Sequence, residues 1–138
     1  MRKPRKREQS PRLQPEQYEC QTFIRRLRQY YYEIFCRIYH IKNESKTAHI
    51  PDIGILSGVP DYCYPVARGG YHACYIEMKK PEAIKLADGG ISEDQSKIIA
   101  QLEADGNFCI VCYNWEQALE AVLIYDQGIA SEIPTKSL

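Results

Sequence analysis

The sequence predicts an α/β domain in which a mixed β-sheet is flanked by helices. One segment in the N-terminal third repeats its apolar residues at helical spacing, and runs rich in Tyr, Cys, Val and Ile lie on either side of a glycine pair. The patterns occur in the order helix, three strands, helix, strand and helix. With 138 residues, of which 44% are hydrophobic, the chain is long enough to bury a core as one domain.

The first helix is expected over residues 16–33. Apolar side chains recur at helical spacing from Phe23 and Leu27 onward, and Pro15 suits a first helical position because that backbone N–H is not needed there. Residues 35–41 are then predicted to form the first strand. The helix therefore has one apolar face with which to cover the sheet.

The second and third strands are expected to form a β-hairpin around Gly69. If the turn is centred on that residue, facing residues have numbers that sum to 138, so Asp61 lies opposite Glu77. Directly opposed residues have Cβ atoms about 5 Å apart and point the same way. Lys79 shares a face with Glu77, because side chains alternate along a strand. A shift of one residue would place the two carboxylates on opposite faces.

The second half of the chain is predicted to add a loop, a helix, a buried strand and a last helix. Ser92 and Gln95 have the spacing of a capping box, which marks the start of the helix. The loop is expected at residues 81–90, the helix at 92–106, the buried strand at 108–113 and the last helix at 115–125. The domain thus ends in a helix that follows a strand, and the sheet contains a crossover.

Asp61 and Glu77 would repel each other if they were held side by side without a partner. A divalent cation between them would remove the repulsion and use both carboxylates as oxygen ligands, and such ligands favour Mg²⁺ or Mn²⁺ over zinc. Lys79 would lie beside the same spot. The alternative is that an acid and a lysine near the end of a strand form an ordinary surface pattern.

The six cysteines indicate a reducing compartment. They fall within predicted strands and helices, where cysteine behaves as a small buried hydrophobe. Cys109 and Cys112 have C-x-x-C spacing, but three positions along a strand place them on opposite faces, which excludes shared zinc ligation. No apolar stretch of eighteen residues exists, so no membrane span is expected.

Three short motifs carry a resemblance to a known family. They are Gly58-x-Pro60-Asp61, then Ile76-Glu77-x-Lys79 on a strand, then Ser92-x-x-Gln95 at a helix start. This arrangement, over residues 16–125, resembles the virus-type replication-repair nuclease (VRR-NUC) domain of the PD-(D/E)XK nuclease superfamily, in its stand-alone viral or bacterial form. The resemblance implies a restriction-endonuclease-like fold and metal-dependent hydrolysis of DNA phosphodiesters.

The resemblance also implies roles for particular residues. Asp61 and Glu77 would hold Mg²⁺ or Mn²⁺, with the Met78 backbone carbonyl as a further ligand. Lys79 would orient or deprotonate the attacking water and offset charge in the transition state.

Two further positions are implied by the family pattern. An acid on the first helix belongs to the family's active site, and Glu19 is the first choice here, with Glu16 as the alternative. Gln95 matches a glutamine of the site. Ordinary explanations stand beside both: an acid near a helix N-terminus complements the helix dipole, and Gln95 could simply complete a capping box.

The implied substrate is branched DNA. Stand-alone members of the family resemble Holliday-junction resolvases, which act as homodimers on four-way junctions. The aromatic run Tyr30–Tyr32 and the last helix, with Trp115 and Leu119, are candidate dimer surfaces. The alternatives are a nuclease for flaps or duplex ends and a non-catalytic DNA-binding module on the same fold.

The chain is expected to divide into a basic, disordered arm at residues 1–14, a nuclease domain at 15–126 and a C-terminal tail at 127–138. The first twelve residues hold six Lys or Arg against Glu8, although the net charge of the chain is zero. Such an arm suits phosphate binding, and a solubilising tail is the alternative. An intracellular location is expected, in bacterial cytoplasm or that of a phage-infected host.

Overall fold

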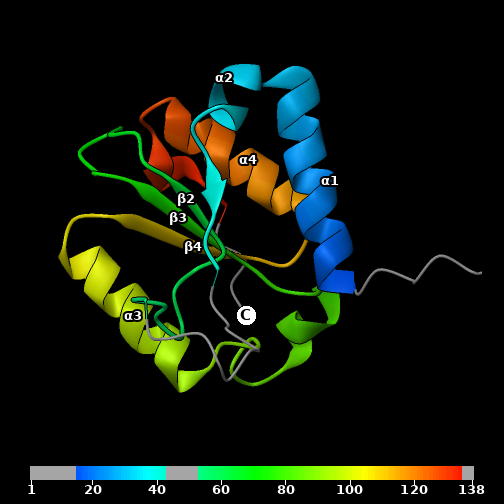
Figure 1. Ribbon diagram of the computed structural model, residues 1–138, viewed down its shortest axis with the longest axis vertical. Helices are drawn as coiled ribbons and strands as arrows, with labels where there is room; N and C mark the ends of the chain where they lie inside the picture. Colours follow the sequence, from blue (N-terminus) through cyan, green and yellow to red (C-terminus); the bar gives the residue numbers. More distant parts are fainter. Residues whose placement is uncertain (1–14, 43–52, 135–138) are drawn as a thin grey trace, which may run out of the picture.

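The computed structural model describes residues 15–42 and 53–134, so the basic arm lies outside the described residues. Four strands form one mixed sheet in the order β1-β2-β3-β4. Helices α1 and α4 pack against each other beside the sheet, and α3 lies next to β4, away from both (Figure 1). The predicted α/β class, with a mixed sheet flanked by helices in a restriction-endonuclease-like arrangement, is confirmed.

The first helix is shorter than predicted. Helix α1 spans Pro15–Tyr30, the chain leaves helical geometry at Tyr31, and a one-turn helix α2 follows at Tyr32–Phe35. The apolar spacing continues across this break, which is why the sequence pattern does not reveal it. The predicted strand over residues 35–41 is correspondingly wrong in extent, because β1 comprises only Tyr39–His40.

The hairpin has the predicted register but a different turn. Strands β2 (Tyr62–Tyr64) and β3 (Cys74–Met78) are antiparallel, and their paired residues have numbers that sum to 138. The turn is not centred on Gly69. It is a two-residue loop in which Gly69 and Gly70 both have positive φ angles, of 57° and 90°, and Arg68 pairs with Tyr71.

One extra residue reconciles the turn with the register. Three residues, at 65–67, separate Tyr64 from Arg68, whereas two residues separate Tyr71 from Cys74. The surplus is taken up by a tight bend in which the Val66 amide donates a hydrogen bond of 2.9 Å to the Tyr64 carbonyl. The bend therefore acts as a bulge that returns β2 to the register on which Asp61 and Glu77 depend.

The end of α4 holds this bend in place. Tyr125 Oη donates a hydrogen bond of 2.6 Å to the Val66 carbonyl, and Arg68 Nε donates one of 3.0 Å to the carbonyl of Asp126. Gly69 also approaches Gly128 so closely that a Cβ atom on Gly69 would lie 2.6 Å from the Gly128 carbonyl oxygen. The hairpin and the C-terminal end of α4 are thus in direct contact.

The remaining elements follow the predicted order. Strand β4 is parallel to β3 and forms one end of the sheet, and β3 lies between β2 and β4. The elements are the 3₁₀ helix η1 (Pro81–Lys85), α3 (Glu93–Ala104), β4 (Phe108–Cys112), α4 (Trp115–Asp126) and the 3₁₀ helix η2 (Ala130–Glu132). The predicted loop at residues 81–90 therefore begins as a short helix.

The core lies between the sheet and the pair of helices α1 and α4. Phe23 and Leu27 of α1 are fully buried, and the ring of Phe23 meets that of Tyr62 edge-on. Ala130 and Ile133 are also buried in this core, so the packed domain extends into the segment that the sequence marks as a tail. No helix in residues 15–42 and 53–134 is long and apolar enough to cross a membrane.

All six cysteines lie in the described part of the chain and are free thiols. Cys63, Cys74 and Cys112 are buried in strands, as expected. Cys36 is exposed at the end of α2, so the prediction of a buried environment is wrong for this residue. Cys36 is the residue that follows α2, outside the short strand β1.

Candidate active site

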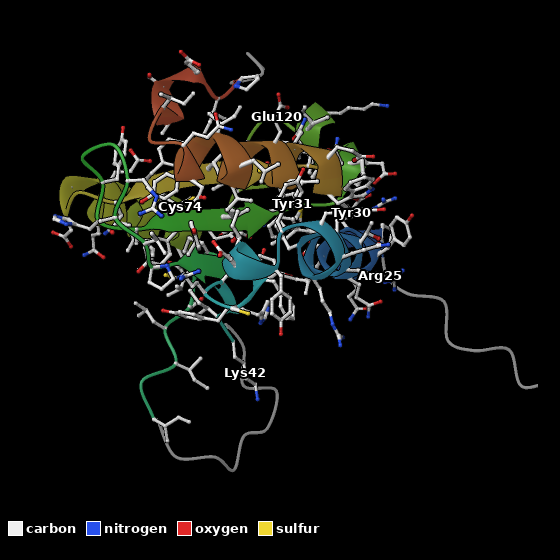
Figure 2. All side chains as sticks on the ribbon, turned by 90° about the horizontal axis from the view of Figure 1, so that it is seen from above. Arg25, Tyr30, Tyr31, Lys42, Cys74 and Glu120 are labelled. Carbon is white, nitrogen blue, oxygen red and sulfur yellow. The ribbon has the colours of Figure 1, made fainter. Side chains whose placement is uncertain are left out.

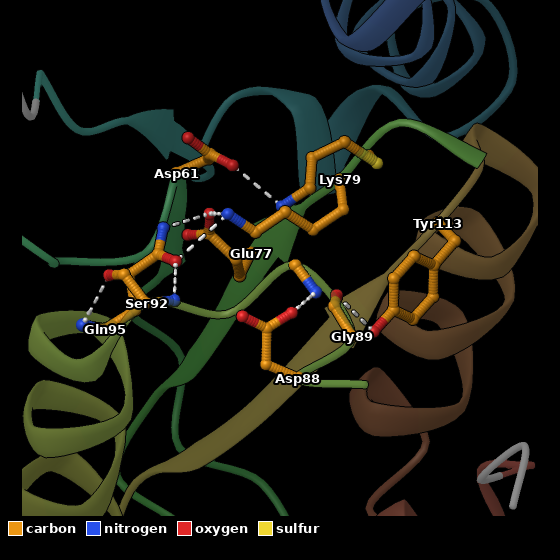
Figure 3. A network of polar contacts seen from close by, with 10 residues as sticks. Asp61, Glu77, Lys79, Asp88, Gly89, Ser92, Gln95 and Tyr113 are labelled. Carbon is orange, nitrogen blue, oxygen red and sulfur yellow. Dashed lines mark hydrogen bonds and ion pairs between the residues drawn. The ribbon is translucent and has the colours of Figure 1, made fainter. Parts of the chain in front are cut away.

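The end of the β2–β3 pair brings Asp61 and Glu77 together. Tyr62 pairs with Ile76, so Asp61, one residue before β2, falls opposite Glu77. Asp61 Oδ2 accepts a hydrogen bond of 2.7 Å from the Met78 backbone amide, which fixes this carboxylate at the end of β3. Figure 3 shows the two carboxylates in one cluster with Lys79 and Gln95. The predicted same-face arrangement therefore follows from the observed register.

Glu77 is almost completely enclosed, although it carries an ionisable group. The residue is 3% exposed, and its Oε1 atom accepts a hydrogen bond of 2.8 Å from Gln95 Nε2 and lies 3.2 Å from Lys79 Nζ. Its other oxygen, Oε2, is buried and has no hydrogen-bond partner among the described residues. A buried acceptor without a partner destabilises a fold, so Oε2 is an oxygen available to a cation.

Gln95 joins the first turn of α3 to the carboxylate cluster. Its Oε1 atom accepts hydrogen bonds from the Ser92 backbone amide, at 2.9 Å, and from Lys79 Nζ, at 3.0 Å. The Ser92 amide can only donate, so the amide group of Gln95 is oriented with Nε2 toward Glu77. The capping box is complete, because Ser92 Oγ accepts from the Gln95 backbone amide at 3.2 Å. Gln95 therefore caps the helix and contacts the candidate site at the same time.

Burial governs the pKa values of both carboxyl groups. Desolvation, followed by the charge of Asp61, raises the pKa of Glu77 to about 7, and Lys79 offsets part of this rise. Desolvation also raises the pKa of Asp61, against the hydrogen bond from the Met78 amide and the charges of His40 and Lys79. Both ionised carboxylates are thus destabilised, and a bound cation would relieve the destabilisation.

The structure places Glu19 at a different helix end. Glu19 Oε2 accepts a hydrogen bond of 2.7 Å from the backbone amide of Trp115, the first residue of α4. This carboxylate caps α4 and complements the positive end of its dipole. The charge of Glu16 is among those that raise the pKa of Glu77.

The loop after β3 closes one side of the site. Tyr113 Oη donates a hydrogen bond of 2.8 Å to the Gly89 carbonyl, and the Gly90 amide donates one of 2.8 Å to Asp88 Oδ1 (Figure 3). A Cβ atom on Gly90 would lie 3.7 Å from Lys79 Cδ, so this loop packs along the lysine side chain. Sequence reasoning did not assign these contacts, because no local pattern connects Tyr113 with a loop residue 24 positions earlier.

The donor set fits a hard divalent cation. Among residues 15–42 and 53–134, no three His, Cys, Asp or Glu side chains converge as a metal cluster. Mg²⁺ is commonly bound in proteins through one or two carboxylates together with water and substrate phosphates. Glu77, through its unpartnered Oε2, and Asp61 would supply such a pair. Neither the Met78 carbonyl nor Glu19 is needed for this minimal set.

Comparison with solved structures identifies the fold. A structure described as "VRR_NUC domain protein" superimposes with a TM-score of 0.69 at 20% sequence identity, over 85% of this chain and 92% of that chain. The chain has the fold of a VRR_NUC domain protein. No protein-family model matches the sequence, and no curated protein matches it significantly. The similarity to that structure thus lies in the architecture.

Proposed function

We propose that the protein is a Mg²⁺- or Mn²⁺-dependent endonuclease that hydrolyses DNA phosphodiester bonds. The observation that carries this proposal is the buried, unpartnered Oε2 atom of Glu77, which lies beside an anchored lysine and opposite Asp61. A structural carboxylate would be expected to have partners for both oxygens. The fold shared with a VRR_NUC domain protein supports the same function.

The bound cation would neutralise phosphate charge, provide a metal-activated water and stabilise the leaving oxygen. Glu77 and Asp61 would hold it, with the Met78 carbonyl as a further candidate ligand. Lys79 Nζ is held by two contacts, at 3.0 Å from Gln95 Oε1 and 3.2 Å from Glu77 Oε1. The amino group is therefore in position before the substrate binds. We infer that Lys79 orients the attacking water and offsets charge on the phosphate in the transition state.

We further propose a homodimer that cuts four-way junctions. The described chain presents one carboxylate cluster, so paired cuts on two strands require two chains, and a two-fold dimer matches the approximate symmetry of a junction. The tyrosines Tyr30, Tyr31 and Tyr32 are 59%, 39% and 64% exposed, where α1 ends and α2 begins. Figure 2 shows Tyr30 and Tyr31 side by side at this point. The three tyrosines are the candidate dimer surface.

The other candidate dimer residues are less available. Trp115 and Leu119 are partly buried against the core, and the guanidinium of Arg26 lies 5.1 Å above the Trp115 ring. Arg26 also lies 5.9 Å from the Tyr30 ring centroid. The exposed tyrosine run is therefore a better candidate for contact with a second chain than the helix α4.

The test is a cleavage assay on four-way junctions, flaps and plain duplexes, with Mg²⁺ and with EDTA. We expect junction cleavage that EDTA abolishes, and Asp61→Asn to lose cleavage while DNA binding persists or improves, because a charge that repels phosphate is removed. Lys79→Met should be inactive. Lys80→Met is its matched control, since Lys80 is the adjacent exposed lysine and should retain cleavage.

The same assay separates the alternatives. Cleavage of flaps or duplex ends with junctions left intact would favour the other kind of nuclease. DNA binding without cleavage of any substrate would favour a non-catalytic DNA-binding module. Full activity of Asp61→Asn would show that the reaction does not use this cluster.

A further inference from the structure

The loop that leads to Asp61 lies directly on the first turn of α3. Gly58, three residues before Asp61, has a φ angle of +89°. A Cβ atom there would lie 2.7 Å from the Asp94 carbonyl carbon, 2.8 Å from its oxygen and 2.9 Å from the Gln95 backbone nitrogen. These are backbone atoms of a helix and cannot rotate aside. Only glycine permits this approach, for its small size as well as for its positive φ.

The turn that Gly58 touches is the one that carries Gln95. Ser92 is the N-cap of α3, and Gln95 occupies the third helical position. Gln95 donates to Glu77 Oε1 at 2.8 Å and accepts from Lys79 Nζ at 3.0 Å. The Gln95 backbone nitrogen is itself among the atoms in contact with Gly58, so a displacement of the turn moves this side chain directly.

The segment from Gly58 to Asp61 is held at both ends. At one end, Ser57 Oγ lies 3.5 Å from Asp94 Oδ2, next to the Gly58 contact. At the other end, the Asp61 carbonyl accepts a hydrogen bond of 2.7 Å from the Ile41 amide, and its side chain accepts one from Met78. Pro60 between them is fully buried and has a fixed φ angle. The segment therefore connects the sheet to α3 with little freedom.

We propose that Gly58 is a positioning residue: its missing side chain lets α3 approach the sheet closely enough for Gln95 to hold Glu77. The expected effect on the cleavage rate rests on the proposed nuclease function. The expected effect on the position of α3 rests only on the contact of Gly58 with Asp94 and Gln95. An alanine at position 58 would require a shift of about 0.7 Å to reach the 3.4 Å at which ordinary van der Waals contact begins. Displacements near 1 Å around reacting groups can cost about a hundredfold in rate.

Gly54 provides a matched control. Its φ angle is +91°, close to that of Gly58, but apart from its chain neighbours no atom of the described residues lies within 4 Å of a Cβ built there. Alanine at either position has the same unfavourable φ, and only at position 58 does the new methyl group meet α3. We expect Gly58→Ala to lower kcat for DNA cleavage about a hundredfold, to leave KM for DNA within about twofold, and to raise the Mg²⁺ concentration for half-maximal activity. Gly54→Ala should resemble the wild type.

A double-mutant cycle tests whether Gly58 acts through Gln95. If it does, Gly58→Ala combined with Gln95→Ala is no slower than Gln95→Ala alone. Rate reductions that multiply would overturn the proposal, because Gly58 would then act by another route. If Gly58→Ala does not fold, Ser92→Ala loosens the same turn by removing the acceptor of the Gln95 backbone amide. Wild-type Mg²⁺ activation in Ser92→Ala would also overturn the proposal.

A second readout does not require cleavage. The side-chain amide signals of Gln95 can be identified in the ¹⁵N–¹H spectrum of the metal-free protein by their absence in Gln95→Ala. We expect these signals to keep their wild-type positions in Gly54→Ala and to move toward those of a free glutamine side chain in Gly58→Ala. Unmoved signals in a folded Gly58→Ala variant would overturn the inference. A wild-type protein that cuts no DNA, with signals that move as expected, would refute the nuclease function and leave the positioning role in place.

Discussion

Replacing the Glu77 carboxyl by an amide should stabilise the metal-free protein at high pH. Burial raises the pKa of Glu77 from 4.5 to about 7, so the folded state favours the protonated form. A carboxyl with a raised pKa contributes stability below its unfolded pKa and loses that contribution as the pH rises through the folded value. Glutamine resembles the protonated acid in shape and charge, and it does not titrate.

The magnitude follows from the size of the shift. A rise from 4.5 to about 7, at 1.36 kcal/mol for each pKa unit, corresponds to about 3 kcal/mol. At pH 8 in EDTA, Glu77→Gln should therefore have a free energy of unfolding up to about 3 kcal/mol above that of the wild type, which is a Tm about 10 °C higher for a chain of this size. At pH 5 the difference should fall to about 1 kcal/mol, because Glu77 is then protonated in the folded wild type and largely ionised in the unfolded chain.

Thermal and urea unfolding at pH 5 and pH 8, in EDTA and in Mg²⁺, measure these differences. Added Mg²⁺ at pH 8 should stabilise the wild type and not the variant, so the difference should shrink. Glu103→Gln, at an exposed position on α3, is the control and should leave the pH dependence unchanged. A wild type that is more stable than Glu77→Gln at pH 8 in EDTA would refute the reasoning, since Oε2 would then have a partner in the folded protein.

Three further predictions concern the arm, the acids of α1 and the oligomeric state. Deleting residues 1–12 should weaken DNA binding and reduce the slope of log affinity against log salt by about 0.9 for each phosphate that the arm neutralises, and an unchanged slope would make the arm a passive tail. Glu19→Ala should lower the free energy of unfolding by about 2 kcal/mol, because the Trp115 amide is deprived of a charged acceptor, without changing the Mg²⁺ concentration for half-maximal cleavage. Glu16→Ala should raise the Mg²⁺ concentration for half-maximal cleavage. If Glu19→Ala raised this concentration and Glu16→Ala did not, Glu19 would be the acid that belongs to the site. Light scattering at micromolar concentration should give a dimer, and a monomer would favour the flap nuclease.

Local sequence signals were sufficient for much of the geometry of the candidate site. The alternation of strand residues placed Glu77 and Lys79 on one face, and the spacing of Ser92 and Gln95 marked a helix start that the structure bears out. Both signals depend on residues only a few positions apart, so they can be recognised from the spacing of residues in the sequence. The α/β order could be predicted for the same reason, since each element carries its own periodicity.

Contacts between distant segments could not be predicted. The partner of Glu19 is a backbone amide 96 residues later, which becomes its neighbour only when α1 and α4 pack together. The break at Tyr31 was hidden because the apolar spacing is the same on both sides of it. Gly58 stands in a recognisable motif, yet its close contact with α3 is visible only once the loop and the helix are both placed.

The bulge at residues 65–67 has a consequence for the order of folding. A hairpin that formed from its two-residue turn alone would continue the pairing of Arg68 with Tyr71, and that register sets Asp61 opposite Met78. The bend that corrects the register is secured by Tyr125, 59 residues after Val66, so the correction requires a contact between distant segments. Such contacts are slow to form, because the intervening chain must first be ordered. We therefore expect the two carboxylates to reach the same face of the sheet late in folding, after α4 has packed against the hairpin.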